Sequence, residues 1–481
     1  MISKLPTIPG LIITLLAVLV GFAKAEEPVA REDTDGRVEA HIALATAWAE
    51  QYLIRHDIPG AAIAFVQDDK TYIKQGLGKK NERGEKVDEN TLFRLCSLAK
   101  PFTAISLAAE EERGGLSFDD KITDYVGNFP TDAAEAPELR ALLLHVGGAP
   151  AEAPFPYFVE LKFPTRAEIL SSLPTIEFKH APYEHYEYSN VGFVLAAEAI
   201  QQVSGKSWGA YMNENVFTSI GMNDAIPDLN LPQTPSNYSD GFTIVLDEKR
   251  RTFSPYQTNG LSPAAGILAS ISDMDAFMRW HFRVLDGKDN DLITAAGLRK
   301  LLRVGWAQPD GRGARRGLGY GFYESDNTTF VGHGGYCSGY RSVMALNLAS
   351  RAGVTALINV NDASPYDLAF GVLQIMSAAL SERHSAAERE SNSDLDQFAG
   401  VYDRWGMPER VKIVSDGSRL IVMNLFTDSP WRSLKSYIPI GGGRFQNESD
   451  PTEIVEFEAP SDGRAMRFWQ YPRFHYLTRM D

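Results

Sequence analysis

The sequence predicts an α+β fold class: an antiparallel sheet flanked by helices, with an inserted helical subdomain, plus a small C-terminal antiparallel β-barrel or sandwich. At 481 residues the chain is long enough for more than one domain. Strand patterns occur early and return after residue 328, around a mostly helical middle. A polar stretch at 381–395 is then followed by strand and turn patterns alone. Because early and late strands can pair, we expect both ends of the larger domain to close one sheet.

The larger domain is expected to begin with a helix and a hairpin. Apolar residues recur at helical spacing over 38–55. Two strand-like runs follow at 61–66 and 71–76, joined by the turn-like sequence Gln-Asp-Asp-Lys. An extended stretch at 91–95 then leads into a helix that starts near Ser97.

The middle and the end of this domain are interpreted in the same way. One helix is expected after Tyr188, through Ile200, and another from Ser272, where Asp275 gives a pattern close to a capping box. Late strands then complete the sheet, and a helix ends the domain. These last elements are expected at 328–333, 340–348, 354–360 and 365–380.

The C-terminal part differs in composition. Residues 381–395 are polar and charged, with almost no large apolar side chain, which predicts a linker. Beyond it, two strand pairs are each joined by a Ser-Asp-Gly turn, at 415–417 and 461–463. Hairpins without helices predict the barrel or sandwich, over 396–481. We hypothesise that this unit packs over the active cleft or tunes substrate access.

Residues 1–25 resemble a secretory signal peptide. A lysine precedes an apolar run from Leu11 to Ala23, and the sequence Ala-Lys-Ala at 23–25 fits a cleavage site. We therefore expect the larger domain to span 26–380 in a secreted or periplasmic protein without a stable membrane span; an uncleaved anchor is the alternative. The net charge of −15 argues against nucleic acid and anionic membranes as partners. The oligomeric state stays unknown.

Two cysteines occur, Cys96 and Cys337, so the chain is no disulfide framework. Sequence leaves open whether they form one bridge. Cofactor motifs are absent from the sequence: it has no His-Glu-x-x-His, no P-loop and no dinucleotide fingerprint, and His180 and His185 are five residues apart. We therefore expect no cofactor and no metal.

Ser97-Leu98-Ala99-Lys100 is the stretch with the clearest chemistry. Residues three apart share a helical face, so the Lys100 amine can reach the Ser97 hydroxyl. A serine hydroxyl becomes a nucleophile when an adjacent base takes its proton, and burial lowers a lysine pKa toward that role. A lone Ser-x-x-Lys is common by chance, however, and the alternative is a serine N-cap with a surface lysine.

A second stretch, Tyr188-Ser189-Asn190, could serve such a centre. Its phenol could share proton transfer with the lysine, because a cationic neighbour lowers a tyrosine pKa. The alternative is a core tyrosine with a satisfied hydroxyl. His145, between these motifs, is interpreted as a packing or hydrogen-bonding residue.

A third stretch, His333-Gly334-Gly335-Tyr336, lies on the first late strand. Glycines there let a substrate lie against the backbone, and a free N–H could complete an oxyanion hole with that of Ser97. The alternative is a glycine-rich strand end with a surface histidine.

In this order the three motifs resemble those of the class C β-lactamase-like serine hydrolases, a superfamily that includes penicillin-binding proteins, D-amino-acid peptidases and esterases. The similarity covers about residues 40–380. It implies Ser97 as the nucleophile, Lys100 as its proton acceptor and Tyr188 as general base and acid. It also implies substrate contacts, which would come from Asn190, His333, Gly334, Gly335 and Tyr336.

The third motif departs from dedicated class C β-lactamases, which carry Lys-Thr-Gly there. A mostly neutral imidazole without a hydroxyl would hold a substrate carboxylate weakly. We therefore expect an acyl-enzyme hydrolase of small esters or amides, such as D-amino-acid peptides. The alternatives are a β-lactamase or D-alanyl-D-alanine carboxypeptidase, and a non-catalytic binding or regulatory protein. Arg312, Arg315 and Arg316 could supply the missing cation, although such a run is usually a solvated face.

Overall fold

The computed structural model describes residues 36–130, 136–309, 313–381, 393–404, 409–458, 467–471 and 475–480. The signal peptide expected at 1–25 lies outside these residues, and so does Arg312. Most of the expected linker lies outside them as well, and the domain boundaries stay predictions.

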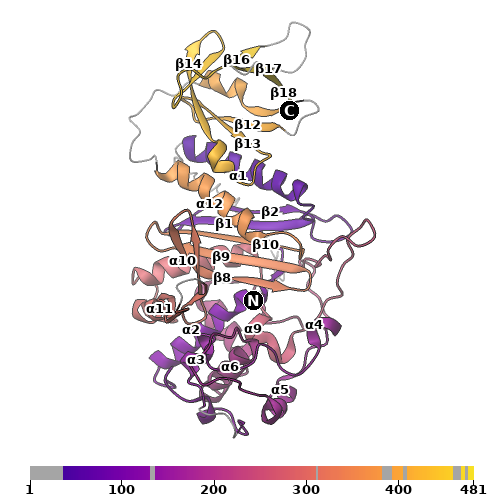
Figure 1. Cartoon of the computed structure of the whole chain (residues 1–481), viewed down its shortest axis with the longest axis vertical. Helices are drawn as coiled ribbons and strands as arrows, with labels where there is room; N and C mark the ends of the chain where they lie inside the picture. The colour runs from indigo at the N-terminus through magenta and orange to yellow at the C-terminus, as the bar shows by residue number, and fades with distance from the viewer. Residues whose placement is uncertain are drawn as a thin grey trace, which may run out of the picture. The chain divides into compact units, whose positions relative to one another are not determined.

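An eight-stranded antiparallel sheet forms the centre of the larger domain (Figure 1). Its order, β2-β1-β10-β9-β8-β7-β6-β5, places the first two strands beside the last ones, as the sequence predicts. The strands are β1 (Gly60–Gln67), β2 (Lys70–Gly78), β5 (Trp306–Ala307), β6 (Arg315–Arg316), β7 (Gly321–Ser325), β8 (Thr328–Cys337), β9 (Tyr340–Asn347) and β10 (Ala352–Ile358).

Strand β1 is buried on both faces and divides two hydrophobic clusters. Side chains alternate across a strand, so successive residues face opposite sides of the sheet. Ala61, Ile63 and Phe65 join the cluster of α1 (Gly36–Arg55) and α12 (Pro365–Ser381). On the other face, Ala62 and Ala64 join the larger cluster that includes α2 (Lys100–Glu112) and α10 (Ile271–Leu285).

The helical region between the early and late strands carries the remaining elements. These are β3 (Phe93–Arg94), α3 (Leu139–Leu143), α4 (Tyr157–Glu160), α5 (Arg166–Ser172), α6 (Asn190–Ser204), α7 (Trp208–Tyr211), α8 (Thr218–Ile220), α9 (Ser262–Ala265), β4 (Leu268–Ala269) and α11 (Ala295–Leu302). Helix α10 begins at Ile271 rather than Ser272, because Ser270 and Asp273 form the capping box, with the Ser270 hydroxyl accepting from the Asp273 N–H.

The C-terminal strands form a closed barrel, so the barrel is correct and the sandwich is not. Its core includes Tyr402, Ile413, Tyr437 and Val455. The strands are β11 (Gly400–Asp403), β12 (Arg410–Ser415), β13 (Leu420–Asn424), β14 (Lys435–Gly441), β15 (Arg444–Asn447), β16 (Ile454–Glu458), β17 (Arg467–Tyr471) and β18 (His475–Arg479).

The barrel contacts α1 and α12. Val414 and Ile421 pack into the cluster that these helices share, and the Trp48 indole N–H donates to the carbonyl of Thr427 at 2.8 Å. The hypothesis that this unit packs over the active cleft is therefore wrong for the described residues, because none of those that line the Ser97 pocket belongs to the barrel. Among the described residues, no helix has the length and hydrophobicity needed to cross a bilayer.

Candidate active site

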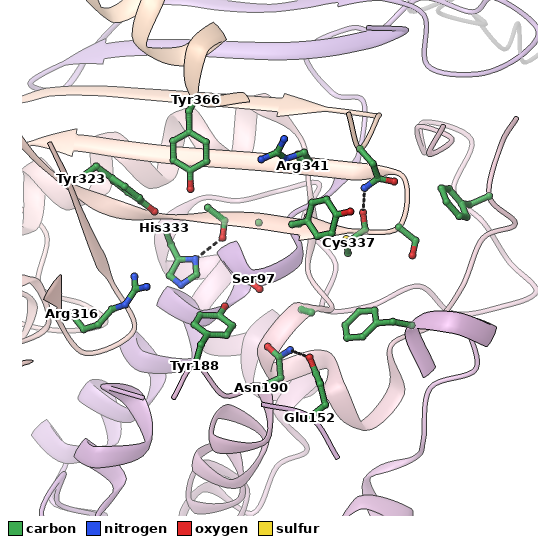
Figure 2. Close-up of a pocket in the computed structure, with 18 residues that line it drawn as sticks. Ser97, Glu152, Tyr188, Asn190, Arg316, Tyr323, His333, Cys337, Arg341 and Tyr366 are labelled. Carbon is green, nitrogen blue, oxygen red and sulfur yellow. Dashed lines mark hydrogen bonds between the residues drawn. The ribbon is translucent and has the colours of Figure 1, made fainter. Parts of the chain in front are cut away.

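Ser97 lies immediately before α2, in a 3₁₀ turn formed by Cys96–Ala99. It lines a pocket of about 800 Å³ between strand β8 and the beginning of α6 (Figure 2). Residues from all three predicted motifs line this pocket, although they are far apart in sequence: Ser97, Tyr188, Asn190, His333, Gly334, Gly335 and Tyr336. The tertiary fold therefore brings together the residues that were selected from motifs alone.

Lys100 is fully buried directly beneath Ser97. Its Nζ is 3.3 Å from Ser97 Oγ, 2.6 Å from Asn190 Oδ1 and 3.1 Å from the Ala264 carbonyl. These three acceptors match the three donors of an ammonium group. Burial nevertheless lowers the Lys100 pKa to about 7, with a further decrease from Arg316. The side chain can therefore exist as a neutral amine at neutral pH.

Tyr188 stacks on His145, with their ring centroids 4.2 Å apart. Its ring also lies 4.8 Å from Lys100 Nζ. Burial raises the Tyr188 pKa, although a hydrogen bond with Ser97 and the charge of Arg316 offset part of the increase. The lowered pKa expected from the sequence is therefore wrong, because burial outweighs the nearby cations; the phenol stays protonated at neutral pH and can donate a proton.

His145 positions the Tyr188 segment. It is buried, its backbone is left-handed with φ of 62°, and its Nδ1 accepts the Ser189 N–H at 2.9 Å. Burial, with Lys100 nearby, holds its pKa well below the usual value, so the ring is neutral. The hydrogen-bonding and packing interpretation of His145 from sequence agrees with this geometry.

Asn190 links Lys100 to a carboxylate that the sequence reasoning missed. Its Nδ2 donates to Glu152 Oε1 at 2.6 Å, while its Oδ1 accepts from Lys100. Glu152 lines the pocket and also accepts from the Tyr157 hydroxyl. Burial raises the Glu152 pKa, although its bonds to Tyr157 and Asn190 oppose this effect. Glu152 is one of many acidic residues in loops, so no local pattern could have identified it.

The third motif lies on the part of β8 that does not pair with β7. Strand β7 pairs with β8 only as far as Gly332, so among the named strands the later part of β8 pairs with β9 alone. Burial, with Lys100 and Arg316 nearby, lowers the His333 pKa to about 3 and keeps the imidazole neutral. Tyr336 is exposed and lines the pocket.

The glycines of this motif have a different structural reason from the one predicted. A Cβ on Gly334 would overlap the Tyr366 hydroxyl, and a Cβ on Gly335 would overlap the Leu95 carbonyl. Because these residues have no side chains, the Tyr366 hydroxyl and the Leu95 carbonyl can pack closely against β8. Both glycines still line the pocket.

Of the two arginines that the structure describes here, Arg315 and Arg316, one reaches the pocket. Arg316 lines it, and its Nε donates to the Tyr186 hydroxyl at 2.9 Å. Arg315 instead pairs with Glu324. The pocket therefore holds a cation from β6 in addition to the neutral His333.

A possible metal-binding group lies in the loop before Tyr188. Ligand atoms of His180, Glu184 and His185 all lie within 4.8 Å of one another, and these side chains are half-buried to exposed. None of the three lines the Ser97 pocket, so they do not place a metal beside the nucleophile.

A protein-family model described as Beta-lactamase matches residues 45–373. The chain belongs to this beta-lactamase family. Penicillin-binding protein 4* of Bacillus subtilis is 26% identical over 331 residues, which cover 66% of this chain and 71% of that protein. The D-aminopeptidase of Brucella anthropi is 29% identical over 336 residues, covering 66% of this chain and 59% of that protein.

The fold has solved counterparts as well. The octameric penicillin-binding protein homologue from Pyrococcus abyssi has a TM-score of 0.61 and 19% identity, covering 91% of this chain and 100% of that one. This likeness concerns the fold. Together with the curated relatives, family membership supports the enzyme class expected from the sequence, a serine hydrolase.

Proposed function

We propose that the protein is a secreted serine hydrolase that forms an acyl-enzyme on Ser97 and cleaves small amides or esters of the D-amino-acid type. The observation that carries this proposal is the buried Lys100 amine, 3.3 Å from Ser97 Oγ and with a pKa near 7. A neutral amine at that distance can accept the hydroxyl proton as the oxygen attacks a carbonyl carbon.

The remaining groups suit the later steps. The N–H groups of Ser97 and Tyr336 would stabilise the oxyanion. The proton taken by Lys100 would pass through the Tyr188 phenol to the leaving amine or alcohol, whose bond to the acyl carbon then breaks. Water would next attack the acyl-enzyme, returning its proton to the same pair and releasing a carboxylic acid and free Ser97.

One charged group of the pocket, the Glu152 carboxylate, favours substrates that carry an amine. Glu152 places a carboxylate beside Asn190, where a positive group on the acyl part would be attracted. The relative named D-aminopeptidase agrees with such substrates. Aromatic side chains of Phe158 and Phe253 also line the pocket and suit an apolar substituent.

A second candidate function, β-lactamase or D-alanyl-D-alanine carboxypeptidase, is favoured by the two arginines that line the pocket, Arg316 and Arg341. Their guanidinium groups offer cations for a substrate carboxylate in a pocket where His333 is neutral.

Two experiments test the proposal. A fluorophosphonate probe should label the protein at Ser97, and Ser97→Ala should abolish this labelling. Ser106→Ala, which changes a buried serine of the adjoining helix α2, should keep it. A panel of D-alanine p-nitroanilide, p-nitrophenyl acetate, a D-alanyl-D-alanine peptide and nitrocefin should then give the highest kcat/KM for the first two. Absent labelling, or nitrocefin as the best substrate, contradicts the proposal.

Export can be tested separately. If residues 1–25 are a cleaved signal, the protein recovered outside the cytoplasm should begin at Glu26. Recovery of the exported protein with Met1 still present contradicts cleavage.

A further inference from the structure

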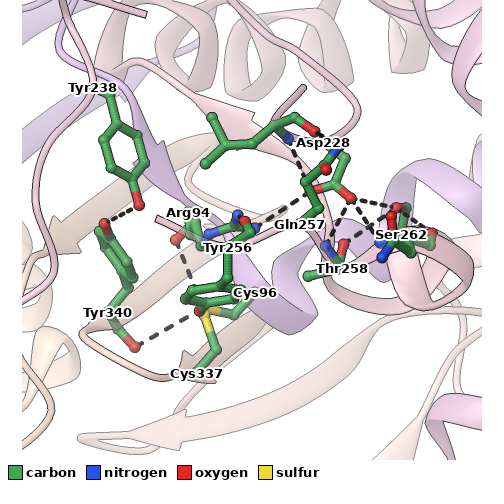
Figure 3. Close-up of polar contacts among 12 residues, drawn as sticks. Arg94, Cys96, Asp228, Tyr238, Tyr256, Gln257, Thr258, Ser262, Cys337 and Tyr340 are labelled. Atoms are coloured by element: carbon green, nitrogen blue, oxygen red, sulfur yellow. Dashed lines mark hydrogen bonds and ion pairs between the residues drawn. A yellow bond between two sulfur atoms is a disulfide. The ribbon is translucent and has the colours of Figure 1, made fainter. Parts of the chain in front are cut away.

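A covalent bridge joins the two segments that carry the expected oxyanion donors. Cys96 and Cys337 form a disulfide, with their Cα atoms 5.7 Å apart and 241 residues between them in sequence (Figure 3). Cys96 immediately precedes Ser97, and Cys337 immediately follows Tyr336. Each cysteine is thus adjacent in sequence to a residue whose N–H is expected to form the oxyanion hole.

Further contacts hold the segment before Ser97 against the sheet. The Leu95 carbonyl accepts from Ser342 Oγ on β9 at 2.7 Å, and it lies so close to Gly335 that no β-carbon would fit between them. The Leu95 N–H donates to the Ile267 carbonyl at 2.9 Å. This segment is therefore clamped to β8 and β9 at more than one point.

Arg94 holds the same segment through a further set of contacts. Its side chain is fully buried, with Nη1 3.6 Å from Asp228 Oδ1 and the guanidinium carbon 4.0 Å from the centre of the Tyr256 ring (Figure 3). Asp228 also accepts from Ser262 Oγ at 3.0 Å, at the start of α9. Arg94 thus ties the segment before Ser97 to the loops that carry Asp228 and Tyr256.

One end of the bridge has an unfavourable backbone conformation. Cys96 has a left-handed backbone with φ of 52°, which is unfavourable for a residue with a β-carbon. The late part of β8 lacks the support of β7, whose pairing ends at Gly332. A bond between Cys96 and Cys337 therefore adds a direct covalent link between the Ser97 turn and the end of β8, which the other contacts hold only through hydrogen bonds and packing.

We propose that the Cys96–Cys337 disulfide positions the two N–H groups of the oxyanion hole. The disulfide would then contribute to stabilising the transition state rather than to binding the substrate. This inference rests on the proposed acyl transfer at Ser97. An oxyanion donor is effective only when its N–H lies about 2.7–3.1 Å from the developing charge. A small separation of the two segments would therefore lower kcat and leave KM nearly unchanged.

The test compares the double variant Cys96→Ala/Cys337→Ala with the wild type. Its readouts are kcat and KM for p-nitrophenyl acetate, and the affinity for phenylboronic acid, which forms a tetrahedral adduct on an active serine. We expect kcat to fall about 10- to 100-fold, boronate affinity to fall by a similar factor and KM to change less than about threefold. Leu373→Ala is the control for lost stability, because Leu373 is buried on α12 and does not line the pocket.

A second measurement avoids the variant altogether. A phosphine reductant breaks the S–S bond by two-electron reduction, giving two thiols and a phosphine oxide whose oxygen comes from water. The reduced wild type should show the same kcat and boronate losses below its unfolding temperature, and reoxidation should restore both. This arm decides the question if the double variant does not fold.

Several results would overturn the inference. They are two free thiols in the purified oxidised protein, a reduced protein that keeps more than half of its kcat and boronate affinity, or losses no larger than those of Leu373→Ala at equal stability. Fluorophosphonate labelling of the wild type distinguishes failure of the disulfide inference from failure of the proposed function. If Ser97 is not labelled, acyl transfer itself is contradicted.

Discussion

The pKa of Lys100 gives a quantitative prediction for the pH dependence of catalysis. Burial lowers it from 10.5 to about 7, a difference that corresponds to about 5 kcal/mol in favour of the neutral amine. At pH 7 about half of the enzyme then holds a neutral Lys100, against about one molecule in three thousand for an ordinary lysine. If the neutral amine is the base, kcat/KM should rise with pH through an apparent pKa near 7.

The charges of Arg316 and Glu152 should shift the apparent pKa of the kcat/KM profile in opposite directions. Arg316 lowers the Lys100 pKa and Glu152 raises it. Arg316→Gln should therefore shift the rise in kcat/KM to higher pH, and Glu152→Gln should shift it to lower pH. Arg303→Gln, which changes an exposed arginine outside the pocket, should leave it unchanged.

The assay is hydrolysis of p-nitrophenyl acetate between pH 5 and pH 9.5, because this ester has no group that titrates there. A profile that is flat across this range refutes the role given to Lys100. Shifts of the same sign in Arg316→Gln and Glu152→Gln refute the electrostatic reasoning.

Further predictions concern proton transfer, specificity and acid stability. Tyr188→Phe should lower kcat about 100-fold with little effect on KM, because the phenol only relays a proton; an unchanged kcat contradicts this role. Glu152→Gln should lower kcat/KM for D-alanine p-nitroanilide about tenfold relative to its N-acetyl analogue, since only the former carries an ammonium group; an unchanged ratio excludes that contact. Burial lowers the pKa of His145, His281 and His333, the last two to about 4 and 3. The unfolded chain therefore binds more protons below pH 6.5. His281 and His333 should each reduce the free energy of unfolding by about 2 kcal/mol when the pH falls from 7 to 5, and His145 should act in the same direction. Urea titrations at the two pH values measure this loss, and equal stability at both would contradict it.

Local patterns were sufficient for most of the fold. The helix at 38–55 and the early and late strands are visible as spacings of apolar residues, and the structure places them in one sheet. The start of α10 was misplaced because Ser270–Asp273 and Ser272–Asp275 offer the same polar spacing, and only packing selects between them. Barrel and sandwich could not be separated either, because closure depends on pairing between β11 and β18.

For the candidate site, too, some residues could be predicted from the sequence and others could not. Ser97 and Lys100 could be predicted because the chemistry requires those residue types three residues apart, and Tyr188 because its motif resembles the one of the family. Glu152 enters the pocket from a loop and Arg316 from β6, and no spacing in the sequence shows that Glu152 lies there or that Arg316, rather than Arg315, does. The disulfide was left open because the distance between two cysteines is a property of the folded chain.

The most direct test of the central claim is to trap the acyl-enzyme during turnover. Protein mixed with p-nitrophenyl acetate and quenched in acid within the first turnovers should gain the mass of one acetyl group. Peptide mapping should place that group on Ser97, and Ser97→Ala should show neither adduct nor turnover. An acetyl group on another residue, or turnover that persists in Ser97→Ala, would contradict acyl transfer at this serine.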